Sequence, residues 1–189
     1  MADTQATLLD TDCDGRIVSD YVLFLNDKIY PHCLARFNYT TYDVRRAQGV
    51  INVNTSNRNI MVLADKDNGL DPRSPYLYGC VLGIYHVNAI YVGPRLSDYN
   101  SRQLKFLWVR WYFNTEPLHE WDTLKLDSVR FTPVNDENAF GFVDPSDVLR
   151  SCHIVPAFSS KKVHSDGIGL SRLAKDSDDW RRYYIIRYG

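Results

Sequence analysis

The chain has 189 residues, which suits a single domain, and 44% of them are hydrophobic, enough for a sizeable core. Lys and Arg number 22 against 23 Asp and Glu, and the formal net charge is −1. This charge argues against a protein whose whole surface binds nucleic acid. No stretch approaches the roughly 18 apolar residues of a membrane-spanning helix, and no secretory signal precedes the four scattered cysteines. We therefore expect no membrane partner and reduced thiols in a nuclear or, alternatively, a cytoplasmic protein.

Aromatic residues are abundant, with 13 Tyr, 8 Phe and 4 Trp, and such residues favour strands. In the first half of the chain, apolar runs separated by turn-forming residues predict several strands. These are one or two short strands within 17–32, strands at 50–54 and 59–65, and, after a loop rich in Asp, Asn, Gly and Pro at 65–75, the long strand 76–92.

The segment QLKFLWVRWYF, residues 103–113, is apolar on both faces of an expected strand. One face carries Phe106, Trp108 and Tyr112, and the other carries Leu107, Val109 and Trp111. Because a surface strand would keep one polar face, this pattern indicates a central strand or a face held ready for a ligand.

The rest of the chain predicts three further strands and two helical segments. The strands are at 126–134, 139–144 and 153–158. Asp144 as a cap and Pro145 in the first helical position predict a single helical turn after the second of them. In GLSRLAKDSDDWRRYYII, residues 169–186, apolar side chains recur near one side of a possible helix.

The stretch DTDCDGRIVSDY resembles the start of a calcium-binding loop, with Asp10, Asp12 and Asp14 ahead of a glycine. Such a loop requires a bidentate glutamate at its twelfth position, and Tyr21 stands there instead. Histidine and cysteine are adjacent at 32–33 and 152–153, so on a strand the two side chains would point to opposite faces. We expect no metal and no cofactor.

Motifs of catalysis are equally absent from the sequence. No nucleophile elbow, P-loop or dinucleotide-binding fingerprint occurs, so we expect no catalytic residues. An enzyme of unrecognised type is the alternative, and it requires a cleft in which His86, His153, Asp144 or Asp147 converge.

Several long segments of the sequence resemble those of an abundant, largely uncharacterised fungal family whose members occur beside or within transposon-derived loci. They include LGIYHVNAIYVG, AFGFVDPSDVLRSCHIVPAF and VHSDGIGLSRLAKDSDDW. The resemblance covers most of the chain and implies a transposon-associated fungal protein, without implying an activity.

The order of elements at 40–160 also resembles the bromo-adjacent homology (BAH) domain, a β-rich module of chromatin proteins. NIMVLAD, YGCVLGIYHV, LWVRWYFNTEP and DVLRSCHIV stand in the places of its characteristic strands, with departures at Asn114, Thr115 and Ser151. The resemblance implies a mainly β, twisted and partly closed barrel at 40–160. An N-terminal arm with short strands at 1–39 and a short C-terminal helical segment at 161–189 would flank it.

The BAH resemblance further implies a non-catalytic chromatin or protein-interaction module whose partner is a histone tail or another peptide. Some BAH domains bind a methylated lysine in an aromatic cage, where ring faces attract the cation and a nearby carboxylate helps. Trp111 with Glu116 is the combination to expect here, with Tyr78, Tyr85 and Tyr112 as further walls. The alternative is that these rings fill the core, and the sequence leaves the oligomeric state open.

The competing hypothesis is a nucleic-acid-binding accessory of a mobile element, with DNA as its partner. Basic residues mixed with aromatic ones suit phosphate contact and base stacking. The basic residues are Arg45, Arg46, Lys161, Lys162, Arg181 and Arg182. The acidic stretch KDSDD at 175–179 favours instead a solvated helical face with intrahelical ion pairs.

Overall fold

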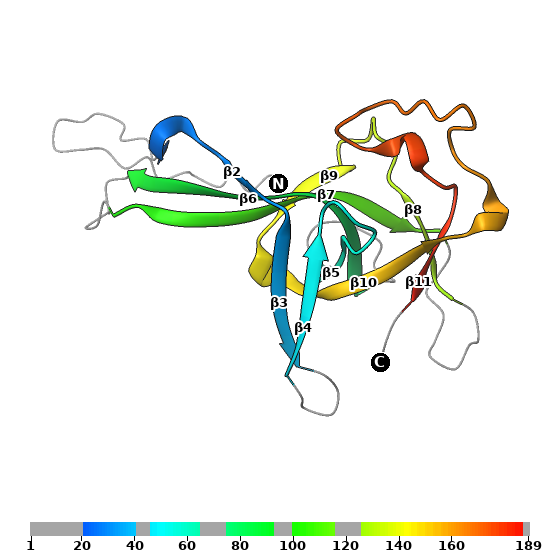
Figure 1. The fold of residues 1–189 in the computed structure, drawn as a ribbon, viewed down its shortest axis with the longest axis horizontal. Helices are drawn as coiled ribbons and strands as arrows, with labels where there is room; N and C mark the ends of the chain where they lie inside the picture. Colours follow the sequence, from blue (N-terminus) through cyan, green and yellow to red (C-terminus); the bar gives the residue numbers. More distant parts are fainter. Residues whose placement is uncertain (1–20, 41–45, 65–74, 93–99, 116–125, 187–189) are drawn as a thin grey trace, which may run out of the picture. The chain divides into compact units, whose positions relative to one another are not determined.

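A computed structural model describes residues 21–40, 46–64, 75–92, 100–115 and 126–186, and strands dominate them (Figure 1). The helical parts of these residues are 3-10 turns of 3 residues each. The expectation of a mainly β fold is therefore confirmed. Within the same ranges, no helix has the length and apolar character needed to cross a membrane.

The strands of the described residues follow one another along the chain with short turns between some of them. They are β1 (Tyr21–Phe24), β2 (Tyr30–His32), β3 (Leu34–Thr40), β4 (Arg46–Asn52), β5 (Asn59–Leu63), β6 (Tyr76–Val92), β7 (Arg102–Asn114), β8 (Ser128–Phe131), β9 (Phe140–Val143), β10 (Val148–Pro156) and β11 (Tyr183–Ile186). The turns are η1 (Leu25–Asp27), η2 (Pro145–Asp147), η3 (Phe158–Ser160) and η4 (Asp176–Asp178).

Most strands belong to one large antiparallel sheet, in the order β1-β6-β5-β10-β11-β8-β7-β9, in which β2 pairs with β6 and β6 also pairs with β7. β3 and β4 form a second, two-stranded sheet. The barrel expected from the BAH resemblance is corrected in this respect: the sheet is large but is not a closed barrel. Its path ends at β1 and β9, and neither strand has a further neighbour among the described residues.

The chain divides into two compact units. The smaller unit comprises Met1–Tyr30 and His86–Leu104, and in it β1 pairs with the end of β6, from Tyr21 opposite Val92 to Phe24 opposite Ala89. The Tyr30 ring stacks on His86 with 4.7 Å between ring centroids. The larger unit comprises Pro31–Tyr85 and Lys105–Gly189, and all residues of the sites below belong to it.

Strand β7 contributes to two hydrophobic clusters of the larger unit. Leu107 and Val109 are buried in a first cluster, and Tyr112 is buried in a second. The apolar alternation of 103–113 therefore reflects a strand with protein on both faces. The first cluster also contains Phe37, Ile51, Val53, Ile60, Val62, Val81, Ile84, Val143 and Val148, and the second contains Met61, Tyr78, Cys80, Leu82, Val129, Cys152, Tyr183 and Ile185.

The helix expected over 169–186 is wrong. Its first part is an extended loop in which Lys175 adopts a left-handed backbone conformation (φ 53°), followed by the short turn η4 and then by strand β11. The buried carboxylate of Asp176 accepts hydrogen bonds from the backbone N–H groups of Leu170 (2.8 Å) and Ser171 (3.0 Å), which bends the loop around it. The β-branched and aromatic run YYII then pairs with β10 and β8, as its strand propensity favours.

The single helical turn expected at Pro145 is confirmed as η2. The Asp144 carboxylate accepts hydrogen bonds from the Ser146 N–H (2.7 Å) and hydroxyl (2.6 Å). These bonds to the ionised form lower the pKa of Asp144.

Candidate functional site

Strands β8 and β9 lie end to end along one side of β7. β9 pairs with Leu107–Arg110, and β8 pairs with Tyr112–Asn114. Trp111 stands at the gap between them: its N–H donates to the Ala139 carbonyl (2.9 Å), and its carbonyl accepts from the Thr132 N–H (3.0 Å). The loop that joins β8 to β9 is therefore held at both ends by one residue of β7.

This loop and β7 enclose a pocket of about 430 Å³, a size typical of sites for small ligands or single side chains. Aromatic rings and a few polar groups form its walls. The lining residues are Leu77, Trp111, Tyr112, Phe113, Arg130, Thr132, Pro133, Asp136, Asn138 and Phe140.

The half-buried indole of Trp111 lies over two glycines. A Cβ added at Gly79 would lie 3.2 Å from Cζ3 of the indole, and one added at Gly141 would lie 2.7 Å from its Nε1. Any side chain at Gly141 would therefore force the indole to move. The two glycines make the space that the ring occupies.

Asp136 provides the acidic group of the pocket. Its Oδ1 accepts a hydrogen bond from the Asn138 N–H (2.8 Å), and its Oδ2 has no partner among the described residues. The guanidinium of Arg130 lies 4.2 Å from the centroid of the Phe113 ring and so covers one face of that ring. A ligand in the pocket would therefore contact the Trp111 and Phe140 rings and the Asp136 carboxylate, with the Arg130 guanidinium as the one positive charge among the lining residues.

The structure gathers only part of the expected cage. Trp111 and Tyr112 both line the pocket, but Tyr112 is buried, its hydroxyl donates to Asn59 Oδ1 (3.2 Å), and burial raises its pKa well above the usual value. Tyr78 is 1% exposed and belongs to the second cluster, while the Tyr85 ring stacks on Phe106 at 5.5 Å. Tyr78 and Tyr85 thus fill other places, and Glu116 lies outside the described residues.

Of the lining residues, the sequence selected Trp111 and Tyr112 but not the others, among them Asp136 and Phe140. The turn signals in TPVNDENAF were visible, since Pro, Asn and Asp favour turns. The sequence did not indicate that these residues lie opposite Trp111, because that position follows from the pairing of both β8 and β9 with one side of β7.

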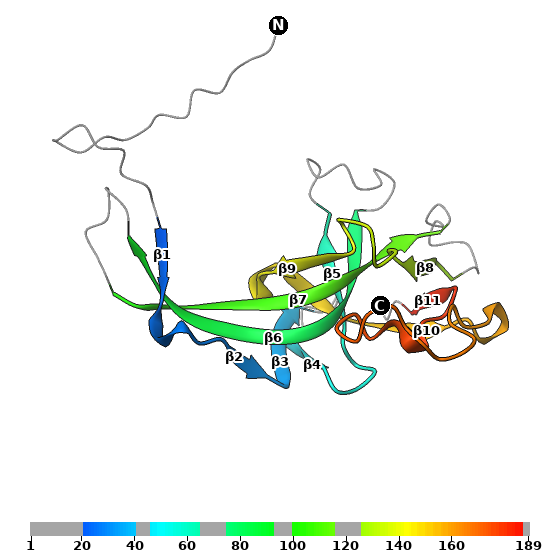
Figure 2. The ribbon, with the colours of Figure 1, turned by 90° about the horizontal axis from the view of Figure 1, so that it is seen from above.

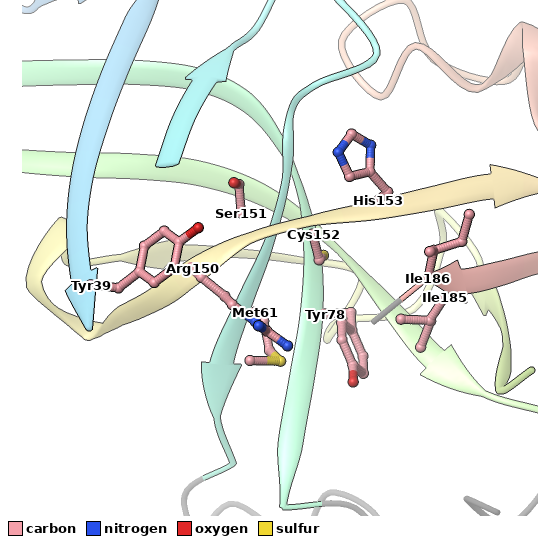
Figure 3. A pocket seen from close by; sticks show the side chains of 9 residues that line it. All are labelled: Tyr39, Met61, Tyr78, Arg150, Ser151, Cys152, His153, Ile185 and Ile186. Carbon is pink, nitrogen blue, oxygen red and sulfur yellow. The ribbon is translucent and has the colours of Figure 1, made fainter. Parts of the chain in front are cut away.

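A second, smaller pocket of about 110 Å³ is lined by residues of β3, β5, β6, β10 and β11 (Figure 3). Its lining residues are Tyr39, Met61, Tyr78, Arg150, Ser151, Cys152, His153, Ile185 and Ile186. Burial raises the pKa of Cys152 to about 12, which keeps its sulfur protonated and makes it a poor nucleophile. Asp144, another candidate for catalysis, instead caps η2.

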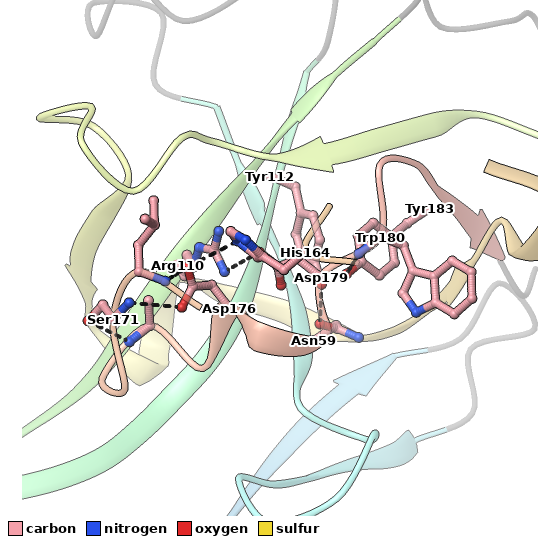
Figure 4. Close-up of polar contacts among 11 residues, drawn as sticks. Asn59, Arg110, Tyr112, His164, Ser171, Asp176, Asp179, Trp180 and Tyr183 are labelled. Carbon is pink, nitrogen blue, oxygen red and sulfur yellow. Dashed lines mark hydrogen bonds and ion pairs between the residues drawn. The ribbon is translucent and has the colours of Figure 1, made fainter. Parts of the chain in front are cut away.

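A buried polar network ties the chain after β10 to β7 (Figure 4). Arg110, 3% exposed, forms an ion pair with the buried Asp179, while Asp176 lies 3.5 Å from Nε2 of His164. Burial raises the pKa of Asp179 to about 6 although Arg110 opposes the shift. Burial also disfavours the ionised Asp176, but the N–H donors of Ser171 and Leu170 outweigh it and lower the pKa.

The basic residues of the nucleic-acid hypothesis are partly brought together. Lys162 forms an isolated bridge with Trp180, and the Arg181 N–H donates to the Lys161 carbonyl (3.2 Å), so Lys161, Lys162 and Arg181 are close in space. Lys162 Nζ lies 2.7 Å from the Asp178 carboxylate, which offsets its charge. Arg182 directly precedes β11, Arg45 lies outside the described residues, and the side chain of Arg46 is not described.

Comparison with known proteins found no family model, no curated protein and no solved structure that matches this chain. Within the ranges that the structure describes, no three His, Cys, Asp or Glu side chains gather as a metal site. The pocket beside Trp111 is therefore the candidate functional site.

Proposed function

We propose that this chain is a non-catalytic protein-interaction module that binds a peptide, with a histone tail as the expected class, by receiving a cationic side chain in the Trp111 pocket. The observation that carries the proposal is the open pocket in which a half-buried indole and the Asp136 carboxylate lie together. The BAH resemblance supports a chromatin role. The resemblance to the transposon-associated fungal family supports a nuclear setting for it.

The physics of the pocket favours a lysine-type cation. The face of an indole attracts an ammonium or a methylated ammonium group, and the attraction grows as water is excluded. The Asp136 carboxylate adds an opposite charge, and Phe140 adds a second ring. Arg130 also lines the pocket, but its guanidinium lies over the Phe113 ring, whereas the Asp136 Oδ2 and the Trp111 indole remain for the ligand.

The proposal is tested with a modified histone-peptide array followed by titration of the bound peptide. Asp136→Asn keeps an oxygen for the Asn138 N–H but removes the charge, so we expect about tenfold weaker binding. Asp144→Asn is the matched control, because Asp144 is also an exposed carboxylate that accepts from the Ser146 N–H and does not line the pocket. Equal affinities of the two variants would refute the cationic pocket.

Nucleic-acid binding is the second candidate function, because Lys161, Lys162 and Arg181 lie close in space. Duplex DNA binding would weaken steeply as salt rises, since bound phosphates release counterions. Lys161→Ala with Arg181→Ala would reduce it, while Asp136→Asn would leave it unchanged. Peptide binding at the Trp111 pocket would instead weaken in Asp136→Asn and stay unchanged in the Lys161→Ala, Arg181→Ala variant.

A further inference from the structure

The outer edge of β9, next to the Trp111 pocket, carries backbone groups that no described residue pairs with. The sheet path ends at β9, which lies along β7 (Figure 2). In an antiparallel pair, residues with inward-facing hydrogen-bonding groups alternate with residues whose groups face outward. The hydrogen bond from the Trp111 N–H to the Ala139 carbonyl sets this alternation for the whole of β9.

The alternation directs the N–H and C=O groups of Phe140 and Phe142 away from β7. Gly141 and Val143 stand opposite Val109 and Leu107 and bond inward. Among the described residues, no hydrogen bond reaches the outward groups of Phe140 or Phe142. An exposed strand edge of this kind is a template for another strand.

Gly141 opens a path from this edge to Trp111. A Cβ at Gly141 would lie 2.7 Å from the indole Nε1, so the indole edge lies directly beside the strand where a side chain would otherwise stand. Paired residues on neighbouring strands point to the same face of a sheet. The residue of an added strand opposite Gly141 would therefore project toward Trp111.

A third pocket, of about 610 Å³, lies at the other end of β9. Its walls combine Val143 of β9 and Val62 and Leu63 of β5 with the polar side chains of Ser146 and Asp147, and Phe142, which also lines it, is 74% exposed. Gly141 and Val143 lie on the same face of β9, so residues i and i+2 of an added strand reach the two pockets in turn.

We propose that the ligand binds as an extended strand added to β9, with a basic residue opposite Gly141 at the Trp111 pocket and an apolar residue two positions away at the Val143 pocket. The inference rests on the proposed function and adds the binding mode and the ligand pattern. The charge of Asp136 selects the basic residue, and Val62, Leu63 and Val143 offer apolar contacts to the other, in a pocket that Ser146 and Asp147 also line. Strand addition supplies affinity through the backbone and specificity through alternate side chains.

The test begins with a phage-displayed library of random linear peptides panned against the whole chain. The tightest binder is then resynthesised with an N-methyl group at one backbone nitrogen at a time. We expect losses of about tenfold at alternate positions and little change between them, because only every second N–H faces the β9 edge.

A variant of the protein tests whether an outward N–H group of β9 bonds to the peptide. Phe142→Pro removes the outward N–H without removing a ladder bond, since an edge strand tolerates proline where its N–H faces outward. Phe142→Ala is the control that removes the ring and keeps the N–H. We expect Phe142→Pro to bind the peptide several-fold more weakly than Phe142→Ala, with both variants folded by circular dichroism.

The outcomes separate the two proposals. Binding that depends on Asp136 but shows no alternation in the N-methyl scan would overturn strand addition and leave the cationic pocket standing. Failure to select any peptide would overturn both proposals. A dimer of the chain that Phe142→Pro dissolves, together with no peptide binding, would assign the edge to a second copy.

Discussion

Nη1 of Arg110 lies 2.7 Å from Oδ2 of Asp179, and both side chains are buried. The same guanidinium lies 4.1 Å from the centroid of the Phe131 ring. The pair therefore joins β7 to the chain that follows β10, at a point where water cannot replace either partner. Removing one partner of such a pair leaves an uncompensated charge in the interior.

Arg110→Ala is expected to lower the free energy of unfolding by about 3–5 kcal/mol, because Asp179 and the Phe131 ring lose their cation together. Arg130→Ala is the matched control, since Arg130 also covers a phenylalanine ring but is exposed, and it should cost about 1 kcal/mol or less. Urea unfolding followed by fluorescence measures both values. Similar losses in the two variants would contradict the structural role of the buried pair.

The raised pKa of Asp179 predicts an unusual pH dependence. The folded-state value of about 6 exceeds the ordinary 3.8, so between these values the folded chain binds more protons at this site than the unfolded chain. Stability from this group is therefore fully present below about pH 4 and is lost as pH rises through about 6. The free energy of unfolding of the wild type, minus that of Asp179→Asn, should fall over this window. A flat or rising difference would show that Asp179 titrates normally.

Asp176 should behave in the opposite way, because its folded-state pKa lies below the ordinary 3.8. Its contribution is present above the unfolded value and is lost as pH falls through the folded value. Asp176→Ala leaves the Leu170 and Ser171 N–H groups without their acceptor and is expected to cost about 2–3 kcal/mol.

The control for Asp176→Ala is Asp166→Ala in the same loop. Asp166 is exposed and accepts only the Ile168 N–H (3.1 Å), so its loss should cost less than about 1 kcal/mol. Hydrogen exchange of residues 163–176 provides the second measurement. Faster exchange in Asp176→Ala alone is the expected result, and equal exchange in both variants would contradict it.

Gly141→Ala tests whether ligand binding depends on the position of the Trp111 indole. The added Cβ would lie 2.7 Å from Nε1 of Trp111, so the ring must shift and the peptide should lose about tenfold in affinity. Gly79→Ala is the milder comparison, because its Cβ would lie 3.2 Å from the ring. The tryptophan fluorescence spectrum should change more in Gly141→Ala. An unchanged spectrum with unchanged affinity would place the ligand elsewhere.

The sequence predicted the strand around Trp111 because alternation shows directly which residues share a face. Tyr112 is buried in one cluster, Leu107 in the other, as a two-sided apolar strand requires. The same alternation did not distinguish the half-buried Trp111 from the buried Tyr78 and Tyr112. Tyr78 and Tyr112 are covered by strands far away in the sequence, and their coverage follows from pairing that no local pattern contains.

The region 169–186 shows how a local pattern can mislead. Leu170 and Leu173 fit a helical stripe, yet they are 76% and 70% exposed, because the Asp176 carboxylate holds the loop by its backbone. A buried acid that accepts main-chain N–H groups competes with helix formation at that point. The strand β3, Leu34–Thr40, was missed for the converse reason: its pairing with β4 supplies the order that its mixed composition does not indicate.

A double-mutant cycle between Asp136 and the basic residue of the bound peptide tests whether the two groups meet in the Trp111 pocket. Wild type and Asp136→Asn are each titrated with the peptide and with a copy in which norleucine replaces the basic residue. Each single change should weaken binding about tenfold, and the two together should weaken it little further, because they remove the same interaction. Additive losses would show that Asp136 and the basic residue do not meet, and would contradict the cationic pocket beside Trp111.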